Sequence, residues 1–520
     1  MSILLSIFLF SLSSNLHPCG LCPRPENKIK KLAAYIVFVK QYTFVPAIFA
    51  IYLGLAENNL EANAQFFQNI TDKIENNVPR LSYGVSVTDF NDDGKMEFIV
   101  TGFRYPNLAL SYENGSYTNI NSSELFADEK RSSIGVVACD VDQDGYEEIY
   151  FLNTDTYSGA KKYSDRLIDA DKTIYDIFSF KKNQANLNLT AGRSVACVDR
   201  HGNGNYGIYV SNYGGPTRFY ELKTDIIQDI APSLGINSTT GGRAVVAGHI
   251  LSGKVDIFAA NERGPNFLLI NEGGTYTDKA LEYGIDDTLQ NGRGTALSDI
   301  GYDGSLDLIT GNWNGFHRIY THANNTFVDT ASLNFRQPSK IRTVISADFD
   351  NDGFDEIFLN NIGQPNKLFR VLDNNKLEQL ELTNALEKTG LGTGGAVADL
   401  NGDGILELLI AHGESAPEPL SLFSANVKDD FQYLRIEPRN SYDAPARGAT
   451  VTLKTNFRTH AKTIDAGSGY LCQMEPVAHF GIRKNEEIEY IQINWTDGQK
   501  SKYKIEKLNH QYIFSQGKTN

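Results

Sequence analysis

The chain has 520 residues, which is more than one ordinary hydrophobic core holds, and it therefore predicts a large repeat domain together with a smaller domain. Its hydrophobic fraction of 41% suffices for packed cores, and its 45 glycines indicate many turns. The formal net charge of −15 excludes nucleic acid as an expected partner, because neutralising phosphates requires a basic face.

The first 56 residues differ in character from the rest. An apolar start (1–16) is followed by a second apolar stretch (32–56), which comes after three lysines and contains Lys40 and Pro46. The small residues at its end are typical of a cleavage site, so we predict a secretory leader over residues 1–56. Two alternatives stay open: an uncleaved signal anchor, for which Lys40 and Pro46 make a poor span, and a start placed too far upstream.

Short acidic loops recur along the middle of the chain. In the clearest one, carboxylates stand at positions 1, 3, 5 and 9 and a glycine that permits a sharp turn stands at position 6: Asp140, Asp142, Asp144, Glu148 and Gly145. Carboxylates at this spacing can converge on one point and form an all-oxygen shell, which suits Ca²⁺ better than Mg²⁺. A single copy would fit an acidic hairpin turn equally well, because Asp and Gly are common turn residues.

The nine-residue pattern occurs seven times at a nearly constant distance. Each period carries four short β-like runs, and a fixed period of this length is typical of a radial or solenoid array. The sequence therefore predicts an all-β fold with a seven-bladed β-propeller over residues 57–425, in which the acidic loop joins the first and second strands of each blade. The first positions are 49 to 59 residues apart, at Asp89, Asp140, Asp199, Gly248, Asp299, Asp348 and Asp399.

The last blade lacks a fourth strand of its own. Its third strand is predicted at residues 419–423, and the residues that follow run into a different domain. Residues 66–71, ahead of the first blade, have the pattern of a fourth strand, so we expect them to complete the last blade. This closure would remove an exposed sheet edge and tie the two ends of the ring together.

The number of oxygen ligands differs between the seven loops. Four loops keep a full set, with asparagine at position 3 in two of them, and a fifth has Gly301 where a ligand should stand. The loops at Asp199 and Gly248 retain one carboxylate each, and we expect them to bind no metal. The sequence thus predicts four strong calcium sites and one marginal site, with a structural role in which the cation neutralises mutually repelling carboxylates. The ligands are Asp89, Asn91, Asp93 and Glu97; Asp140, Asp142, Asp144 and Glu148; Asp348, Asp350, Asp352 and Glu356; Asp399, Asn401, Asp403 and Glu407; and, in the marginal site, Asp299, Asp303 and Asp307.

A second set of polar residues recurs at the opposite end of the first strands. Four arginines precede their loops by five or six residues, and the first strands of a propeller surround its axis, so we expect these side chains to rim the channel on the face away from the acidic loops. Arginine and tryptophan are good anchors for a polar or anionic partner; the alternative is that these residues hold neighbouring blades together. The candidate partner-binding residues are Arg193, Arg243, Arg293, Arg342, Asn261, Asn312 and Trp313.

Alternating strands over residues 430–516 predict a small β-sandwich or barrel-like domain. The repeats resemble the FG-GAP/VCBS class found in integrin α-subunit propellers. The tail, from Arg447-Gly-Ala through Asp465-Ala-Gly-Ser-Gly-Tyr-Leu-Cys472 to Asn494-Trp-Thr-Asp-Gly498, resembles the ASPIC/UnbV domain. The combination implies a secreted, calcium-binding glycoprotein of the extracellular matrix or cell surface. Some members add an EGF-like calcium module after the ASPIC/UnbV domain; the printed sequence has none, and we expect no properties due to that module.

Cysteines and glycosylation sequons bear on the compartment. Five cysteines are few for a disulfide-stapled scaffold, so the fold must rest on its core. Cys139 and Cys197 both stand immediately ahead of an acidic loop in successive repeats, so neighbouring strand ends can bring them together; two buried thiols are the alternative. Seven Asn-x-Ser/Thr sequons fit a secreted chain. Candidate glycosylation sites are Asn69, Asn114, Asn121, Asn188, Asn237 and Asn324, and the seventh sequon is at Asn494.

No catalytic motif accompanies this organisation. The nine histidines are scattered, and no nucleophile elbow, metal-helix motif or phosphate-cradling glycine loop occurs. We therefore expect a secreted binding or scaffold protein and not an enzyme, with Ca²⁺ as its cofactor and an extracellular protein, a receptor or a matrix glycan as partner. No stable membrane insertion is expected after leader cleavage. The alternative is a glycan-binding lectin or a glycan-acting propeller enzyme, since propellers host both.

Overall fold

The computed structural model describes residues 65–170, 173–323, 326–372 and 376–518. The predicted leader over residues 1–56 lies outside the described residues. In the part that is described, no helix combines the length and hydropathy required to cross a membrane. Gln65–Asn520 form one compact unit, in which a large β region is followed by a smaller one.

The large region consists of antiparallel strands that sort into seven groups of four within the described residues. The first three groups are β2 (Ser82–Thr88), β3 (Glu97–Gly102), β4 (Leu108–Glu113) and β5 (Ser116–Asn119); β6 (Ser133–Cys139), β7 (Glu148–Asn153), β8 (Arg166–Asp169) and β9 (Tyr175–Asp176); and β10 (Gly192–Val198), β11 (Gly207–Pro216), β12 (Arg218–Lys223) and β13 (Ile226–Asp229). The next three are β14 (Thr239–Gly248), β15 (Asp256–Asn261), β16 (Phe267–Asn271) and β17 (Tyr276–Asp278); β18 (Gly292–Ser298), β19 (Asp307–Asn312), β20 (Arg318–Ala323) and β21 (Thr326–Asp329); and β22 (Ile341–Ala347), β23 (Glu356–Asn361), β24 (Lys367–Leu372) and β25 (Lys376–Leu380). The seventh is β26 (Gly392–Ala398), β27 (Glu407–His412), β28 (Ser421–Ala425) and β1 (Phe67–Asn69).

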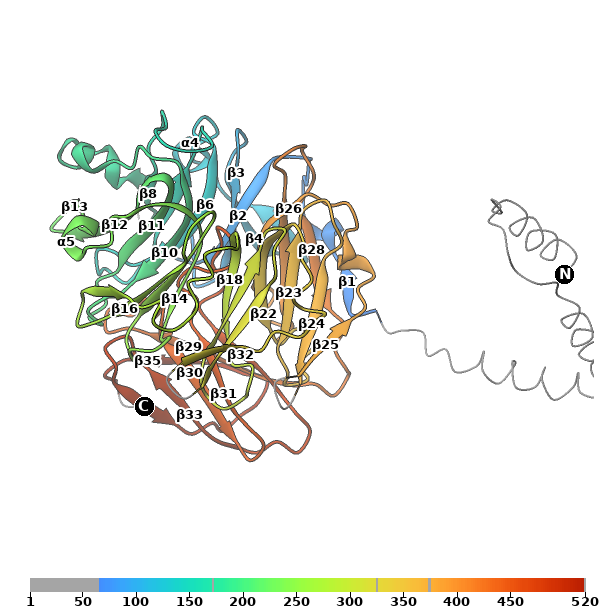
Figure 1. Cartoon of the computed structure of the whole chain (residues 1–520). Coiled ribbons are helices and arrows are strands. Elements are labelled where there is room, and N and C mark those ends of the chain that lie inside the picture. The colour runs from blue at the N-terminus through green and yellow to red at the C-terminus, as the bar shows by residue number, and fades with distance from the viewer. Residues whose placement is uncertain (1–64, 171–172, 324–325, 373–375, 519–520) are drawn as a thin grey trace, which may run out of the picture. The chain divides into compact units, whose positions relative to one another are not determined.

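The groups follow one another around a common axis, from blue through green to orange in Figure 1. Neighbouring first strands contact one another in the order β2, β6, β10, β14, β18, β22 and β26, and β26 contacts β2. This closed arrangement is that of a β-propeller and confirms the predicted all-β class. The third and fourth groups also share one sheet, because the long β11 pairs with β14.

The strand β1 lies ahead of the first group in the sequence but belongs to the last group in space. It pairs antiparallel with β28, with Phe67 opposite Ala425 and Asn69 opposite Phe423. The Phe67 side chain is buried, and its ring packs edge-on against Phe349 at 5.2 Å between centroids. The pairing joins the start of the described chain to the last group of the propeller.

The apolar core fills the spaces between neighbouring sheets. One cluster, for example, packs Val87 and Leu110 of the first group against Leu409 and Leu422 of the seventh. Cys139 at the end of β6 and Cys197 in β10 form a disulfide that links the first strands of the second and third groups. Short helical segments lie in the connections: η3 (Thr71–Lys73), α4 (Glu124–Ala127), η4 (Ile177–Ser179), η5 (Lys181–Asn186), α5 (Ala231–Leu234) and η6 (Asn384–Leu386).

The C-terminal domain, residues 430–516, has two sheets that pack face to face around Ile436, Val451, Phe480 and Trp495. The sequence predicts a sandwich or a barrel-like domain here, and the two separate sheets correspond to the sandwich. One sheet has the order β32–β29–β35, with β29 and β35 parallel, and the other has the order β31–β30–β33–β34. The strands are β29 (Gln432–Arg439), β30 (Thr450–Thr455), β31 (Thr459–Thr463), β32 (Ala478–Ile482), β33 (Ile488–Asn494), β34 (Lys500–Tyr503) and β35 (His510–Ser515).

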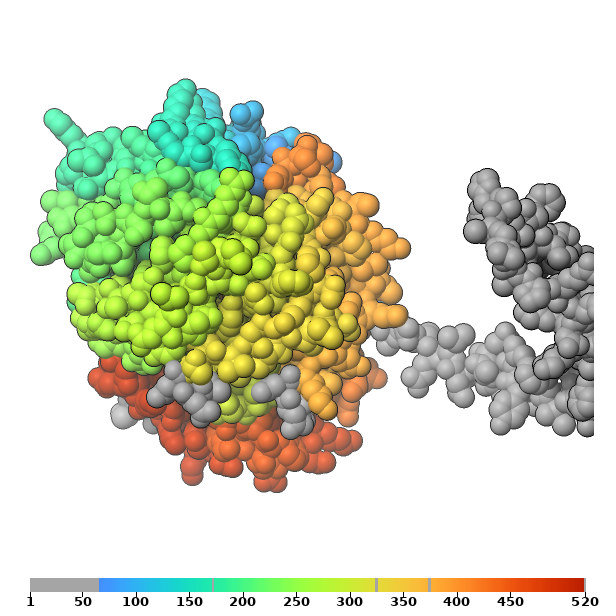
Figure 2. Space-filling view, in the orientation of Figure 1, coloured from blue at the N-terminus to red at the C-terminus, as the bar shows by residue number. Residues whose placement is uncertain are grey.

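The C-terminal domain, red in Figure 2, packs against one side of the propeller. Residues 464–477, which we call the central loop, run between β31 and β32 and bond to the first strands of several groups. The Cys197 N–H donates to the Ala466 carbonyl at 2.7 Å, and the Gln473 N–H donates to the Val85 carbonyl at 2.9 Å. Because these first strands surround the axis, the central loop lies in the middle of the ring.

Candidate metal centres

The acidic loops share a turn at the glycine of position 6, and all seven lie in the described part of the chain. The glycine at position 6 has a φ between 71° and 99° in each loop, which is a left-handed conformation that favours glycine. In six loops the N–H of this glycine donates to the position-1 aspartate at 2.9–3.2 Å. In five loops the acidic residue at position 9 accepts the N–H of position 2 at 2.7–3.1 Å. The first and last carboxylates are therefore held in place by the loop itself.

The Asp140 loop brings three carboxylates to one point. Ligand oxygens of Asp140, Asp142 and Glu148 lie within 4.8 Å of one another. Asp140 and Glu148 are buried and Asp142 is exposed. Burial and mutual repulsion raise the pKa of Asp140 to about 7 and that of Asp142 to about 6. None of the three forms an ion pair with a cationic side chain of the described residues, so a bound cation is the counter-charge that would favour their ionised forms.

The Asp348 loop gathers Asp348, Asp350 and Glu356 within the same distance. Oδ2 of Asp348 accepts from the N–H groups of Gly353 and Gly481 at 3.0 and 2.8 Å. Its Oδ1 is buried and has no hydrogen-bond partner. Buried acceptors are almost always satisfied, so this free oxygen fits a ligand whose partner is a metal ion. Burial, followed by the charge of Asp352, raises the pKa of Asp348 well above its usual value.

A basic residue that the sequence analysis did not single out enters the Asp348 loop. Arg370, on β24, lies 2.8 Å from Glu356 and 3.2 Å from Asp352, and it also bonds Asp350. Its position follows from strand register, since Arg370 stands opposite Glu356 in the β23–β24 pair. The two clusters therefore differ: one has an internal counter-charge and the other has none.

The remaining loops do not bring three carboxylates together among the described residues. In the Asp399 loop, the amide of Asn401 donates to Glu407 at 2.6 Å. Burial raises the pKa of Glu97 to about 8 in the Asp89 loop, and that of Asp299 to about 8 in the loop expected to be marginal. The ranking into four strong sites, one marginal site and two empty loops stays a prediction, and the geometry favours Asp140 and Asp348.

The position-1 aspartates also hold the C-terminal domain. Oδ2 of Asp299 accepts the Ala461 N–H at 2.9 Å, just as Oδ2 of Asp348 accepts that of Gly481. In one of the two loops that retain a single carboxylate, Asp199 accepts the Thr496 hydroxyl at 2.8 Å. The acidic loops are thus the docking surface of the C-terminal domain as well as candidate metal sites, which the sequence analysis did not anticipate.

Arg447 makes the most extensive bridge between the two domains. Its guanidinium is fully buried and donates to both carboxylate oxygens of Glu147, at 2.8 and 3.0 Å. It also donates to the carbonyls of Val87, Asp465 and Met474 at 2.7, 3.0 and 2.8 Å. Because Glu147 directly precedes Glu148, one of the three clustered carboxylates, this bridge is anchored in the Asp140 loop.

The four candidate partner-binding arginines lie at the other end of the first strands and are only 2–7% exposed. Arg243 and Arg293 share Glu262 at 2.6 and 2.9 Å, while Arg342 pairs with Glu414. The guanidinium groups of Arg293 and Arg342 lie 4.9 and 4.3 Å from the centroid of Trp313. The amides of Asn261 and Asn312 are buried and donate to the carbonyls of Pro265 and Phe316. These contacts are the ones expected if the residues hold neighbouring blades together and do not bind a partner.

The candidate glycosylation sites differ in accessibility. Asn69, Asn114 and Asn237 are exposed, and Asn121 is half-buried. Asn188 requires a correction, because its side chain is fully buried and its amide nitrogen donates to Asp165 and Asn212 at 2.6 and 3.1 Å. The acceptor nitrogen of this sequon is therefore not free to carry a glycan in the folded protein. Asn324 lies outside the described residues.

Comparisons with known proteins agree with both parts of the chain. The family described as ASPIC and UnbV matches residues 439–520, and the FG-GAP-like repeat matches residues 89–151, 299–359 and 348–410. The chain is 44% identical over 492 residues to cartilage acidic protein 1 of Homo sapiens, covering 86% of this chain and 74% of that protein. It is 43% identical over 477 residues to cartilage acidic protein 1 of Xenopus tropicalis, covering 83% and 74%. A crystal structure of BBS1N in complex with ARL6DN aligns at 11% identity with a TM-score of 0.44, covering 70% of this chain and 97% of that one.

Proposed function

Because this chain belongs to the cartilage acidic protein 1 family, we propose that it is a secreted, calcium-binding glycoprotein that acts as an interaction scaffold in the extracellular matrix or at the cell surface. The cartilage name of its relatives supports an extracellular location. The Cys139–Cys197 disulfide suits an oxidising compartment, and the exposed sequons at Asn69, Asn114 and Asn237 suit a glycoprotein. Its partner is an extracellular protein, a receptor or a matrix glycan, and the protein is not an enzyme.

The observation that carries the calcium assignment is the free, buried Oδ1 of Asp348 within a cluster of three carboxylates. Asp348, Asp350, Asp352 and Glu356 would hold Ca²⁺ in that loop. Asp140, Asp142, Asp144 and Glu148 would hold it in the other. Bound Ca²⁺ would supply the only counter-charge to the carboxylates of the Asp140 loop among the described residues, and in the Asp348 loop it would add to the charge of Arg370. All the ligands are oxygen atoms, which suits a hard cation.

The role of calcium in this proposal is structural. Asp348 bonds both its own loop and Gly481 of the C-terminal domain, so a cation that fixes this carboxylate also fixes the docking surface. Arg447 and Glu147 place a similar bridge beside the Asp140 loop. Calcium therefore keeps the propeller face and the C-terminal domain in one rigid arrangement, which a scaffold requires. Extracellular modules bind Ca²⁺ with dissociation constants on the order of 10⁻⁴–10⁻³ M, suited to millimolar calcium.

Calcium titration of two matched variants tests this proposal. Asp142→Ala removes an exposed ligand from the Asp140 loop, whereas Asn203→Ala changes an exposed side chain in the Asp199 loop, which keeps one carboxylate. We expect the calcium stoichiometry measured by calorimetry to fall by one for Asp142→Ala and to stay at the wild-type value for Asn203→Ala. An unchanged stoichiometry in Asp142→Ala would contradict a site in this loop.

A further inference from the structure

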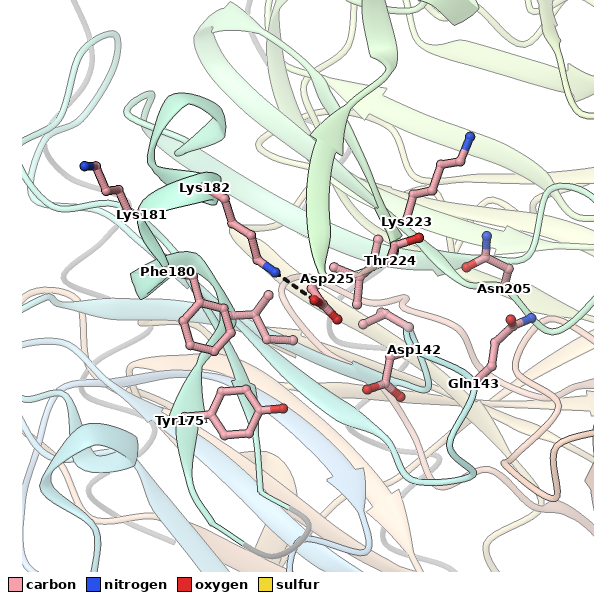
Figure 3. A pocket seen from close by; sticks show the side chains of 13 residues that line it. Asp142, Gln143, Tyr175, Phe180, Lys181, Lys182, Asn205, Lys223, Thr224 and Asp225 are labelled. Atoms are coloured by element: carbon pink, nitrogen blue, oxygen red, sulfur yellow. Dashed lines mark hydrogen bonds and ion pairs between the residues drawn. The ribbon is translucent and has the colours of Figure 1, made fainter.

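A cavity of about 990 Å³ opens between the second and third groups, beside the Asp140 loop (Figure 3). One wall is formed by Tyr175 of β9 and by Phe180 and the lysines of η5, and the other by the turn between β12 and β13. Asp142 and Gln143 of the acidic loop complete the lining, together with Asn205. The volume lies at the upper end of the roughly 300–1,000 Å³ typical of ligand pockets.

Three lysines surround this cavity, although the chain as a whole carries a net charge of −15. Lys181 and Lys182 come from η5, and Lys223 comes from the end of β12. Lys181 and Lys223 are exposed, and neither is paired with a carboxylate of the described residues. Lys182 lies 2.8 Å from Asp225, but the two side chains are 41% and 74% exposed. Exposed pairs of this kind contribute little, so Lys182 can turn to an anionic ligand.

Aromatic rings form the apolar part of the wall. The rings of Tyr175 and Phe180 are 5.6 Å apart between centroids and inclined by 30°. Phe180 is 40% exposed, and the ammonium group of Lys182 lies 5.8 Å from its centroid. An exposed ring beside ammonium groups and side-chain amides suits a ligand with apolar C–H faces, hydroxyls and anionic substituents. Oligosaccharides that carry sulfate or carboxylate groups have this combination.

A peptide fits this place less well. Peptides commonly add a strand to a free sheet edge, and β13 is the outermost strand of its group. However, Asn183 of η5 accepts the Ile227 N–H at 3.1 Å, and Asn186 donates to the Ile227 carbonyl at 3.0 Å. The strand edge is therefore already bonded by side chains of the same chain.

From these observations we propose that the cavity lined by Tyr175, Phe180, Lys181, Lys182 and Lys223 binds an acidic oligosaccharide. This inference rests on the proposed function, because it names the partner class of the same extracellular scaffold. Asp142 belongs to the carboxylate cluster of the Asp140 loop and also lines the cavity. Calcium in that loop neutralises the carboxylate on the cavity wall, so the glycan binds more tightly when calcium is present.

Titration of the full-length secreted protein with a heparin octasaccharide, at physiological ionic strength with and without calcium, tests the inference. Lys181→Glu combined with Lys223→Glu reverses two charges at the cavity, and Lys376→Glu combined with Lys388→Glu reverses two exposed lysines outside it. We expect about tenfold weaker binding for the cavity pair and little change for the matched pair. Phe180→Ala leaves the charge unchanged and is expected to weaken binding several-fold.

Three outcomes overturn the inference: equal loss of binding in both lysine pairs, equal binding of neutral dextran, or binding of a poly-glutamate peptide that does not depend on Phe180. The first would indicate attraction by overall charge, and the last would indicate a peptide site. The calcium comparison separates the two proposals. Glycan binding to a protein that takes up no calcium would refute the calcium assignment alone. Normal calcium uptake without glycan binding would refute the cavity alone.

Discussion

Replacing Arg447 by alanine is expected to loosen the C-terminal domain from the propeller. The substitution removes the two bonds to Glu147 and leaves that carboxylate, whose side chain is 4% exposed, without its cation. Three carbonyl groups, of Val87, Asp465 and Met474, lose a donor at the same time. The bonds to Glu147 and Val87 join the two domains, and those to Asp465 and Met474 hold Arg447 to the central loop, so the loss falls on tertiary structure.

The magnitude follows from the burial of this pair. Removing one partner of a buried ion pair costs about 3–5 kcal/mol, because the other charge is left uncompensated. Gln65–Asn520 span 456 residues (520 − 65 + 1). At about 2.1 cal/mol/K per residue, their unfolding entropy is about 1 kcal/mol/K, so a loss of about 4 kcal/mol lowers the melting temperature by about 4 °C. If the C-terminal domain separates from the propeller before the ring unfolds, proteases also cleave the connection at residues 426–431 faster.

Scanning calorimetry and limited proteolysis measure the two effects. Arg439→Ala is the matched control, because Arg439 pairs with Glu437 at 2.7 Å in the same domain but its side chain is 30% exposed. Loss of this exposed ion pair should lower the free energy of unfolding by less than about 1 kcal/mol. Arg447→Met combined with Glu147→Gln removes both charges and should cost less than Arg447→Ala. A melting temperature and cleavage rate for Arg447→Ala equal to those of Arg439→Ala would refute the reasoning.

Three further outcomes are expected. Arg370→Met should strengthen calcium binding at the Asp348 loop, since Arg370 competes for its carboxylates; a titration that finds unchanged affinity would contradict this. When free calcium is at ten times the dissociation constant, removing it with EDTA should destabilise the protein by about 1.4 kcal/mol per site. Calorimetry measures this drop, and added magnesium should not reverse it. Burial raises the pKa of Glu262, but the charges of Arg243 and Arg293 outweigh burial and hold this pKa below the usual 4.5. The ionised Glu262 therefore stabilises the folded protein above pH 4.5, and this stabilisation is lost as the pH falls through the lowered pKa. Glu262→Gln should therefore lower the melting temperature at pH 7, and the difference from wild type should shrink towards pH 3; a constant difference would exclude this ion cluster as the cause.

The propeller could be predicted from the sequence because its evidence is local and repeated. The spacing of the acidic loops and the alternation of the strands are visible within each period, and position-6 glycines such as Gly145 follow from the turn they permit. The carboxylate count along the sequence is highest in the Asp140 and Asp348 loops, the two loops of the described chain in which three carboxylates come together. It does not reveal Arg370, because that contact depends on the register between β23 and β24.

The docking of the C-terminal domain could not be predicted in this way. Arg447 and Glu147 are 300 positions apart, and nothing in either local pattern indicates the other. The burial of Asn188 is a tertiary effect of the same kind, since a sequon is recognised from three residues whereas its accessibility depends on Asp165 and Asn212. The four arginines lie in the first strands of their groups, but their partners Glu262 and Glu414 come from other segments.

The central loop has a consequence for the order in which the molecule is made. Residues 464–477 bond to Val85 near the start of the ring, to Cys197 and Thr295 further along it, and to Val397 near its end. A ribosome synthesises these residues after all the strands of the ring, so those strands are made before the segment that bonds to them at the axis. Contacts of such long sequence separation form slowly. Residues made after the ring thus complete the packing of its first strands, and a nascent chain that has not reached residue 464 lacks the loop that bonds to them.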